Sequence, residues 1–139
     1  MTRNLTLLAA SFLSLSGCLE DAACPDMKFE RLEQTDRIVI TDNINKEIKT
    51  ITDKSKIGGL TAFVMSHGTD WATPWAGTPV AKLRANFYVG DKFIGDFGVG
   101  SNFIAAQGCS FFQSRNISAN DREVIMSLLA VKDPYESKQ

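Results

Sequence analysis

The strongest constraint on the fold is a two-residue alternation between positions 83 and 89. Leu83, Ala85, Phe87 and Val89 are apolar, and the residues between them are Arg, Asn and Tyr. Successive side chains of a strand point to opposite faces, so this pattern predicts a strand with one buried face and one solvated face. Such half-buried strands are typical of antiparallel sheets.

Further strands are predicted on both sides of this segment. Downstream, a turn at 90–92 leads into 93–97, and an apolar run from Asn102 to Phe112 predicts one more strand, which gives a three-stranded meander. Upstream, the β-branched run at 37–41 and the segment 47–52 predict a hairpin across the turn formers at 42–45. We therefore expect a sheet of about five strands.

Two stretches have helical periodicity. The first follows a cap at Thr52 or Asp53, contains Gly58 and Gly59, and has an apolar face; we expect the glycines to allow close packing against the sheet. The second follows a cap at Ser118, has its apolar stripe at 124, 125, 128 and 129, and ends before Pro134. The apolar face of the first helix consists of Ile57, Leu60, Phe63 and Val64.

The resulting order, ββαβββα, predicts an α+β fold. Short connections favour a mostly antiparallel sheet, with both helices packed on one face. The second helix is expected to direct Arg122 and Glu123 to solvent. We predict a single globular domain over 27–133, followed by a polar tail over 134–139.

The N-terminus has the pattern of a secretory signal. Arg3 precedes an uncharged apolar run over 5–15, which is too short to cross a bilayer, and small residues follow it. Leu15-Ser16-Gly17-Cys18 resembles the lipobox of bacterial lipoproteins. That resemblance implies a signal peptide over 1–17, cleavage before Cys18, a diacylglycerol on its thiol, and acylation of the new amino group.

The residues after Cys18 bear on location. The segment 18–26 is short, acidic and aperiodic, so we expect a tether that holds the domain close to the membrane. Position 19 is Leu rather than Asp, which by the same resemblance implies an outer-membrane lipoprotein facing the periplasm of a Gram-negative cell. Lys and Arg number 15 against 16 Asp and Glu, a balance that argues against a nucleic-acid partner.

Lipidation of Cys18 would leave Cys24 and Cys109 as an even pair. In an oxidising compartment such a pair usually forms a disulfide, worth roughly 4 kcal/mol for a long loop in the chain-entropy model. Two free cysteines, one of them buried, are the alternative.

The segment 66–80 lacks periodicity and contains both tryptophans, Trp71 and Trp75. Loops of this length without regular structure are uncommon and often functional. Exposed tryptophan is enriched in binding hot spots, so the loop is our candidate binding site. In the alternative, one or both tryptophans fold back to cover the edge of the core.

The only histidine, His67, follows Ser66 and precedes Asp70. These three residues have the composition of a hydrolase triad, but adjacent side chains rarely converge in the required way. We expect a loop histidine that ends a helix, and His67 and Asp70 are, with the tryptophans, candidates for binding a partner. A single histidine without ligand spacing predicts no metal site, and no cofactor motif is present.

These features favour a lipid-anchored envelope protein that binds a protein, or alternatively a glycan, without catalysis. An inhibitor or immunity-type module would fit this description, by analogy alone. The alternatives are an accessory lipoprotein of a larger envelope assembly and, third, a small hydrolase built on Ser66.

Overall fold

The computed structural model describes Phe29 and residues 31–108 and 111–136. The lipidation site Cys18 and the cysteines Cys24 and Cys109 lie outside these residues, so the predictions made for them stay predictions. The elements in chain order are η1 (Leu32–Gln34), β1 (Arg37–Asp42), β2 (Glu47–Ile51), α1 (Lys54–Ser66), β3 (Leu83–Val89), β4 (Lys92–Val99), β5 (Phe103–Gly108), β6 (Phe111–Asn116) and α2 (Ala119–Leu129).

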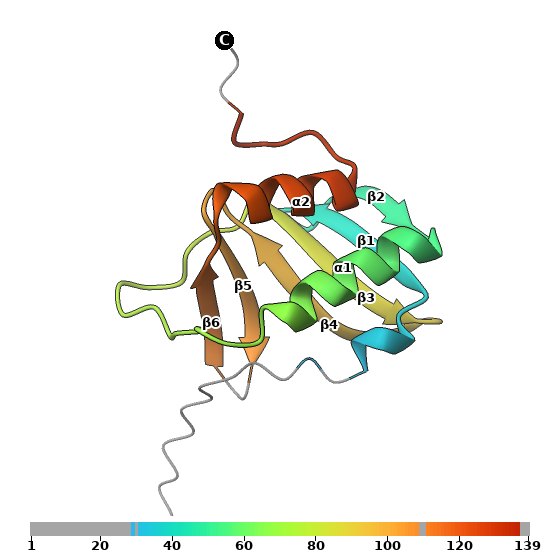
Figure 1. Cartoon of the computed structure of the whole chain (residues 1–139), viewed down its shortest axis with the longest axis horizontal. Coiled ribbons are helices and arrows are strands. Elements are labelled where there is room, and N and C mark those ends of the chain that lie inside the picture. The colour runs from blue at the N-terminus through green and yellow to red at the C-terminus, as the bar shows by residue number, and fades with distance from the viewer. Residues whose placement is uncertain (1–28, 30, 109–110, 137–139) are drawn as a thin grey trace, which may run out of the picture.

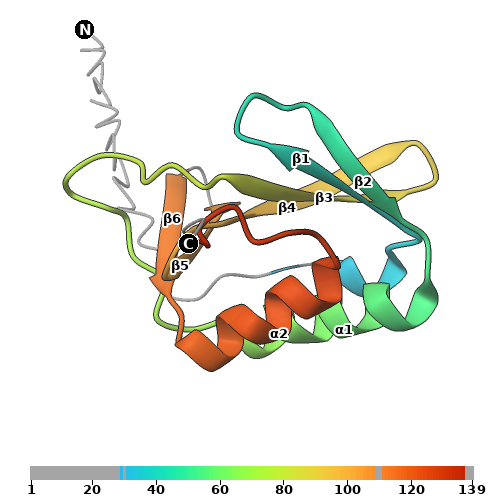
Figure 2. The ribbon, with the colours of Figure 1, turned by 90° about the horizontal axis from the view of Figure 1, so that it is seen from above.

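The strands form one six-stranded sheet in the order β2-β1-β3-β4-β5-β6, and every neighbouring pair is antiparallel (Figure 1). Both helices cover the same face of the sheet, and no helix of the described residues lies on the other face (Figure 2). The predicted α+β fold, with a mostly antiparallel sheet and two helices on one face, is confirmed.

The predicted strand number was too low. The apolar run expected to form one strand over 102–112 forms two, β5 and β6, which pair with each other from Phe103 opposite Asn116 to Gly108 opposite Phe111. The element order is therefore ββαββββα. The reversal escaped prediction because apolar residues flank it on both sides, so hydrophobicity does not change where the chain turns.

The core lies between the sheet and the helices. The inward residues of the β3 alternation, Leu83, Ala85 and Phe87, are all buried. Phe87 packs against Phe97 of β4 with ring centroids 5.6 Å apart. The largest side chains with almost no exposed surface are Phe87, Phe97, Ile38, Ile40, Leu60, Ile104, Ile125, Leu129, Val64 and Val99.

Both helices begin at the predicted caps. Asp53 accepts a hydrogen bond from the Lys56 N–H at 2.9 Å. At the start of α2, Ser118 and Asp121 form a reciprocal capping box, which satisfies main-chain donors that the helix leaves unpaired. None of the helices in the described part of the chain is long and apolar enough to span a membrane.

Two details of the helices differ from expectation. A Cβ at Gly59 would lie 2.6 Å from a methyl group of Leu128, so this glycine allows α1 to approach α2 rather than the sheet. Arg122 does not point freely into solvent: its side chain is 15% exposed, pairs with Asp133 and donates to the carbonyl of Ser101 at 2.9 Å. Its position in the helix wheel gave no sign of these partners, which lie outside the helix.

Candidate functional site

The Ser66, His67 and Asp70 side chains do not converge into a triad. Ser66 Oγ and His67 Nδ1 are 3.0 Å apart, but each also lies within hydrogen-bonding distance of the Phe63 carbonyl, at 2.8 and 2.7 Å. A carbonyl only accepts, so Nδ1 carries the proton and cannot take one from Ser66. Asp70 lies instead beside Arg115, at 3.8 Å.

His67 links the two helices. It is the C-cap residue of α1, its ring stacks on Phe63 with centroids 4.0 Å apart, and its Nε2 lies 3.6 Å from a carboxyl oxygen of Asp121. Hydrogen bonds from the side chain and main chain of Ser118 hold the pKa of Asp121 below its usual value, and the nearby imidazole adds to this effect. The histidine therefore ends one helix at the capping box that begins the next.

The residues between α1 and β3, His67 to Lys82, form a long loop that we call the anchored loop. Its first attachment is Trp71, which is only 6% exposed. The indole N–H donates to the His67 carbonyl at 2.6 Å, and the ring meets Phe29 edge to face at 5.7 Å. Trp71 is thus a core residue that fixes the start of the loop.

The residues on either side of Trp71 fasten the loop to β6. Ala72 and Ser114 exchange main-chain hydrogen bonds of 3.0 and 2.9 Å, which adds one strand-like pair at the edge of the sheet. Arg115 donates to the Thr69 carbonyl at 2.9 Å. At the other end of the loop, the Lys82 N–H donates to the Tyr135 hydroxyl at 2.9 Å.

Trp75 lies between these attachments and is 98% exposed. The loop projects beyond the β6 edge of the sheet (Figure 1), so the largest side chain type in proteins is presented to solvent from a segment fixed at both ends. Trp71 and Trp75, predicted together, therefore occupy opposite environments. The sequence left open whether they are exposed or buried, and the structure answers differently for each.

The second half of the anchored loop lies beside the β1–β2 turn. Residues 78–81 line a cavity of about 340 Å³ together with Arg84 and the turn residues 42, 43 and 45. Val80 of the loop is 72% exposed, and Ile44 of the turn is 74% exposed. The Asp42 carboxylate accepts from the N–H groups of Ile44 and Lys46, which holds the turn in shape.

A second candidate site lies where β4 and β5 separate. The two strands share two residue pairs, Gly98 with Ala105 and Val99 with Ile104, and both lie next to the turn that connects the strands. In the same register Asp96 would face Gln107, but these residues are not paired, although each remains paired on its other side. The two strands therefore diverge (Figure 1).

The divergence has a local cause in β4. The β3–β4 register pairs Phe87 with Gly95 and Tyr88 with Phe93, so Ile94 is an extra residue and forms a bulge. A bulge bends its strand and increases the local twist. The unpaired part of the β4–β5 ladder therefore coincides with the bulged part of β4.

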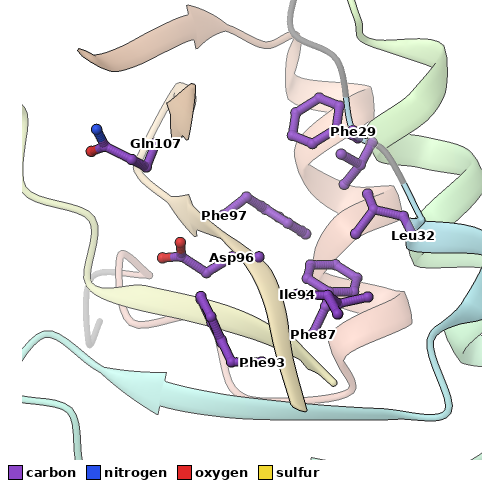
Figure 3. Close-up of a pocket in the computed structure, with 10 residues that line it drawn as sticks. Phe29, Leu32, Phe87, Phe93, Ile94, Asp96, Phe97 and Gln107 are labelled. Carbon is purple, nitrogen blue, oxygen red and sulfur yellow. The ribbon is translucent and has the colours of Figure 1, made fainter. Parts of the chain in front are cut away.

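A cavity of about 370 Å³ occupies the space between the diverging strands. Figure 3 shows Phe29, Leu32, Phe87, Ile94 and Phe97 gathered toward the helices, with Phe93, Asp96 and Gln107 pointing the other way. We call this cavity the wedge; the described residues that line it are Phe29, Leu32, Val64, Phe87, Phe93, Ile94, Gly95, Asp96, Phe97 and Gln107. Sequence reasoning missed the wedge, and the glycines at 95 and 98 were its only signal.

The part of the chain that the structure describes holds no group of three or more His, Cys, Asp or Glu side chains arranged to bind a metal. No protein-family model, curated protein or solved structure matches the chain.

Proposed function

We propose that this chain is a lipid-anchored binding protein of the bacterial envelope, without catalytic activity, and that the anchored loop contacts its partner. The observation that carries the proposal is the exposure of Trp75 on a segment fastened at Trp71, Ala72 and Lys82. A fastened segment loses little conformational entropy when it binds, so more of the contact energy is retained as affinity.

The chemistry of the loop favours a protein partner. Tryptophan contributes a large contact area with few rotatable bonds and is enriched among residues that dominate binding energy. The exposed apolar residues Val80 and Ile44 flank the cavity between the loop and the β1–β2 turn. Together with Trp75 they supply apolar contacts, with polar groups of the cavity between them, as interfaces commonly do.

The location of the partner follows from the N-terminal sequence. A lipid on Cys18 and the tether over 18–26 would hold the domain near the outer membrane, on its periplasmic side. We expect Cys18→Ala to accumulate as an unprocessed, unlipidated precursor. Normal lipid labelling of that variant would contradict the anchor, independently of any result on the loop.

The loop is tested by capture of partners from envelope extract with the full chain and its Trp75→Ala variant. Trp75 contributes nothing to the core, so the variant should keep its unfolding midpoint and lose the captured partner. Met65→Ala is the matched control: Met65 is a 53% exposed apolar residue of α1, outside the loop. Equal capture by Trp75→Ala and the unaltered chain would refute a binding role for the loop.

A further inference from the structure

The wedge has main-chain edges that are free to pair. In an antiparallel strand the N–H and C=O of one residue point to the same neighbouring strand, and alternate residues serve the two neighbours. The Gly98–Ala105 pair shows which residues of β4 and β5 face each other, and Asp96 and Gln107 are next in that series. Among the described residues, none pairs with Asp96 or Gln107 on this side. Unpaired strand edges are templates for an added strand.

The outer edge of the sheet, at β6, differs from the wedge because part of it is already paired. Ala72 pairs with Ser114 there, so the anchored loop covers part of that edge. The wedge has no such pairing among the described residues. It is also lined by apolar side chains, which a simple sheet edge does not offer.

The size and apolar character of the lining suit one bulky apolar group of a ligand. Leu32, Val64 and Phe97 are buried around its helix side, and Phe29 and Ile94 are half-buried at its walls. A volume of about 370 Å³ is within the range of ligand cavities. An extended segment has alternate side chains on opposite faces, so a strand lying in the wedge would direct every second side chain toward this apolar lining.

The charges at the mouth select against an anionic amphiphile. Asp96 is the one ionised side chain among the described lining residues, and it is paired with Arg84. The mouth of the wedge therefore offers no unpaired cation to a carboxylate or phosphate head group. A peptide main chain does not need a cation, because its amides bind through hydrogen bonds alone.

We propose that the wedge binds an extended peptide segment of a partner protein. The segment adds as a strand along β4, pairs with the edge at Asp96, and inserts one bulky apolar side chain between β4 and β5. This site is separate from Trp75, although Phe29 lines the wedge and also contacts Trp71 at the base of the anchored loop. One partner could therefore engage both.

The test uses the ¹⁵N-labelled full chain and a capped hexapeptide, acetyl-Thr-Val-Thr-Phe-Thr-Val-amide. We expect saturable shifts of the Asp96 and Gln107 amide signals and slower hydrogen exchange at both. Two kinds of control peptide are used. One carries Ser in place of Phe, and the other carries N-methyl groups on alternate amides, along one or the other edge of the peptide strand. Each should bind about tenfold more weakly or worse, a loss equivalent to one pairing or packing contact.

Substitutions in the chain test whether the peptide binds in the wedge. Phe93 is a 51% exposed ring at the rim of the wedge, and Phe93→Ala should weaken peptide binding about tenfold while the chain still unfolds cooperatively. Val124→Ala, at a 40% exposed position of α2, should leave binding unchanged. Trp75→Ala should also leave it unchanged, so failure of the loop proposal and failure of this one are distinguishable.

Three outcomes would overturn the proposal. If dodecanoate shifts the same amide signals and the peptides do not, the wedge is a site for small amphiphiles. Equal binding of the N-methylated and parent peptides would exclude strand addition. Absence of any shift at Asp96 and Gln107 with the Phe peptide at millimolar concentration would exclude a peptide site.

Discussion

Trp71 and Trp75 are four residues apart in one loop, and their environments are opposite. Trp71 is 6% exposed, donates a hydrogen bond to the His67 carbonyl and contacts Phe29. Trp75 is 98% exposed. The comparison separates two roles of one residue type: the first tryptophan holds the loop on the domain, and the second is what the loop presents.

The largest effect is expected when the anchor is removed. Trp71→Ala deletes a buried indole and its hydrogen bond, and such changes in a core cost about 3–5 kcal/mol of unfolding free energy. Chemical denaturation monitored by circular dichroism measures the loss. The same structure implies that the double change at Trp71 and Trp75 cannot leave the melting temperature unaltered, contrary to what a fully exposed loop would give.

Trp71→Phe sharpens this prediction, because it keeps an aromatic ring and loses the N–H donor. We expect an intermediate loss, in which the unpaired His67 carbonyl and the smaller ring both contribute. If Trp71→Ala were as stable as the unaltered chain, Trp71 would not be an anchor and the contrast with Trp75 would disappear.

The next effect concerns the strand-like pair beside the anchor. Ala72→Pro removes the N–H that donates to the Ser114 carbonyl at 3.0 Å, and the loss of this hydrogen bond should cost about 0.5–1.5 kcal/mol of unfolding free energy. Amide exchange at Ser114 should become faster. Thr73→Ala, one position further along the loop, is the control and should change neither quantity, since its side chain is exposed.

Local patterns predicted most of the fold. The alternation at 83–89 gave β3 and its buried face, and the period at 57, 60, 63 and 64 gave the inward side of α1. The caps at Asp53 and Ser118 were readable because a capping hydrogen bond joins residues two or three apart. These features depend on neighbours in the sequence, so the sequence contains them.

Features that depend on distant partners were not predictable in this way. Arg122 is drawn inward by Asp133 and by carbonyls of the β4–β5 turn. The wedge lies beside a bulge at Ile94 in the β3–β4 pairing; the glycines in this stretch permit a bulge, but the sequence does not predict the cavity beside it. Both tryptophans lie in an aperiodic stretch of small and polar residues, so the buried one is identified only by its tertiary contacts, with Phe29 and with the His67 carbonyl.

Acid should lower the stability of the region where the anchored loop begins, because His67 accepts a hydrogen bond from Trp71 and lies beside Asp121. Hydrogen bonds from Ser118 hold the pKa of Asp121 below its unfolded value. A carboxyl of this kind contributes stability above its unfolded pKa and loses that contribution as pH falls through the folded pKa. We expect the unfolding free energy to decrease below about pH 4.

Ser118→Ala tests this origin. It removes the helix cap, which costs about 1 kcal/mol at neutral pH, and it returns the pKa of Asp121 toward its usual value. The decrease of stability in acid should therefore be smaller in the variant, and Asp121→Asn should act in the same direction. Parallel pH profiles for the unaltered chain and both variants would show that the capping box makes no contribution to acid sensitivity.

The smallest effect on stability is expected at Trp75. Its side chain is almost completely exposed, so Trp75→Ala should change the unfolding free energy by less than about 0.5 kcal/mol. Acrylamide should quench the fluorescence of Trp75 in the Trp71→Phe variant far more than that of Trp71 in the Trp75→Phe variant. A loss of stability comparable to that of Trp71→Ala would mean that Trp75 also packs on the domain. The loop would then have two anchors and present no tryptophan, so a partner would have to be recognised through Val80, Ile44 or the wedge.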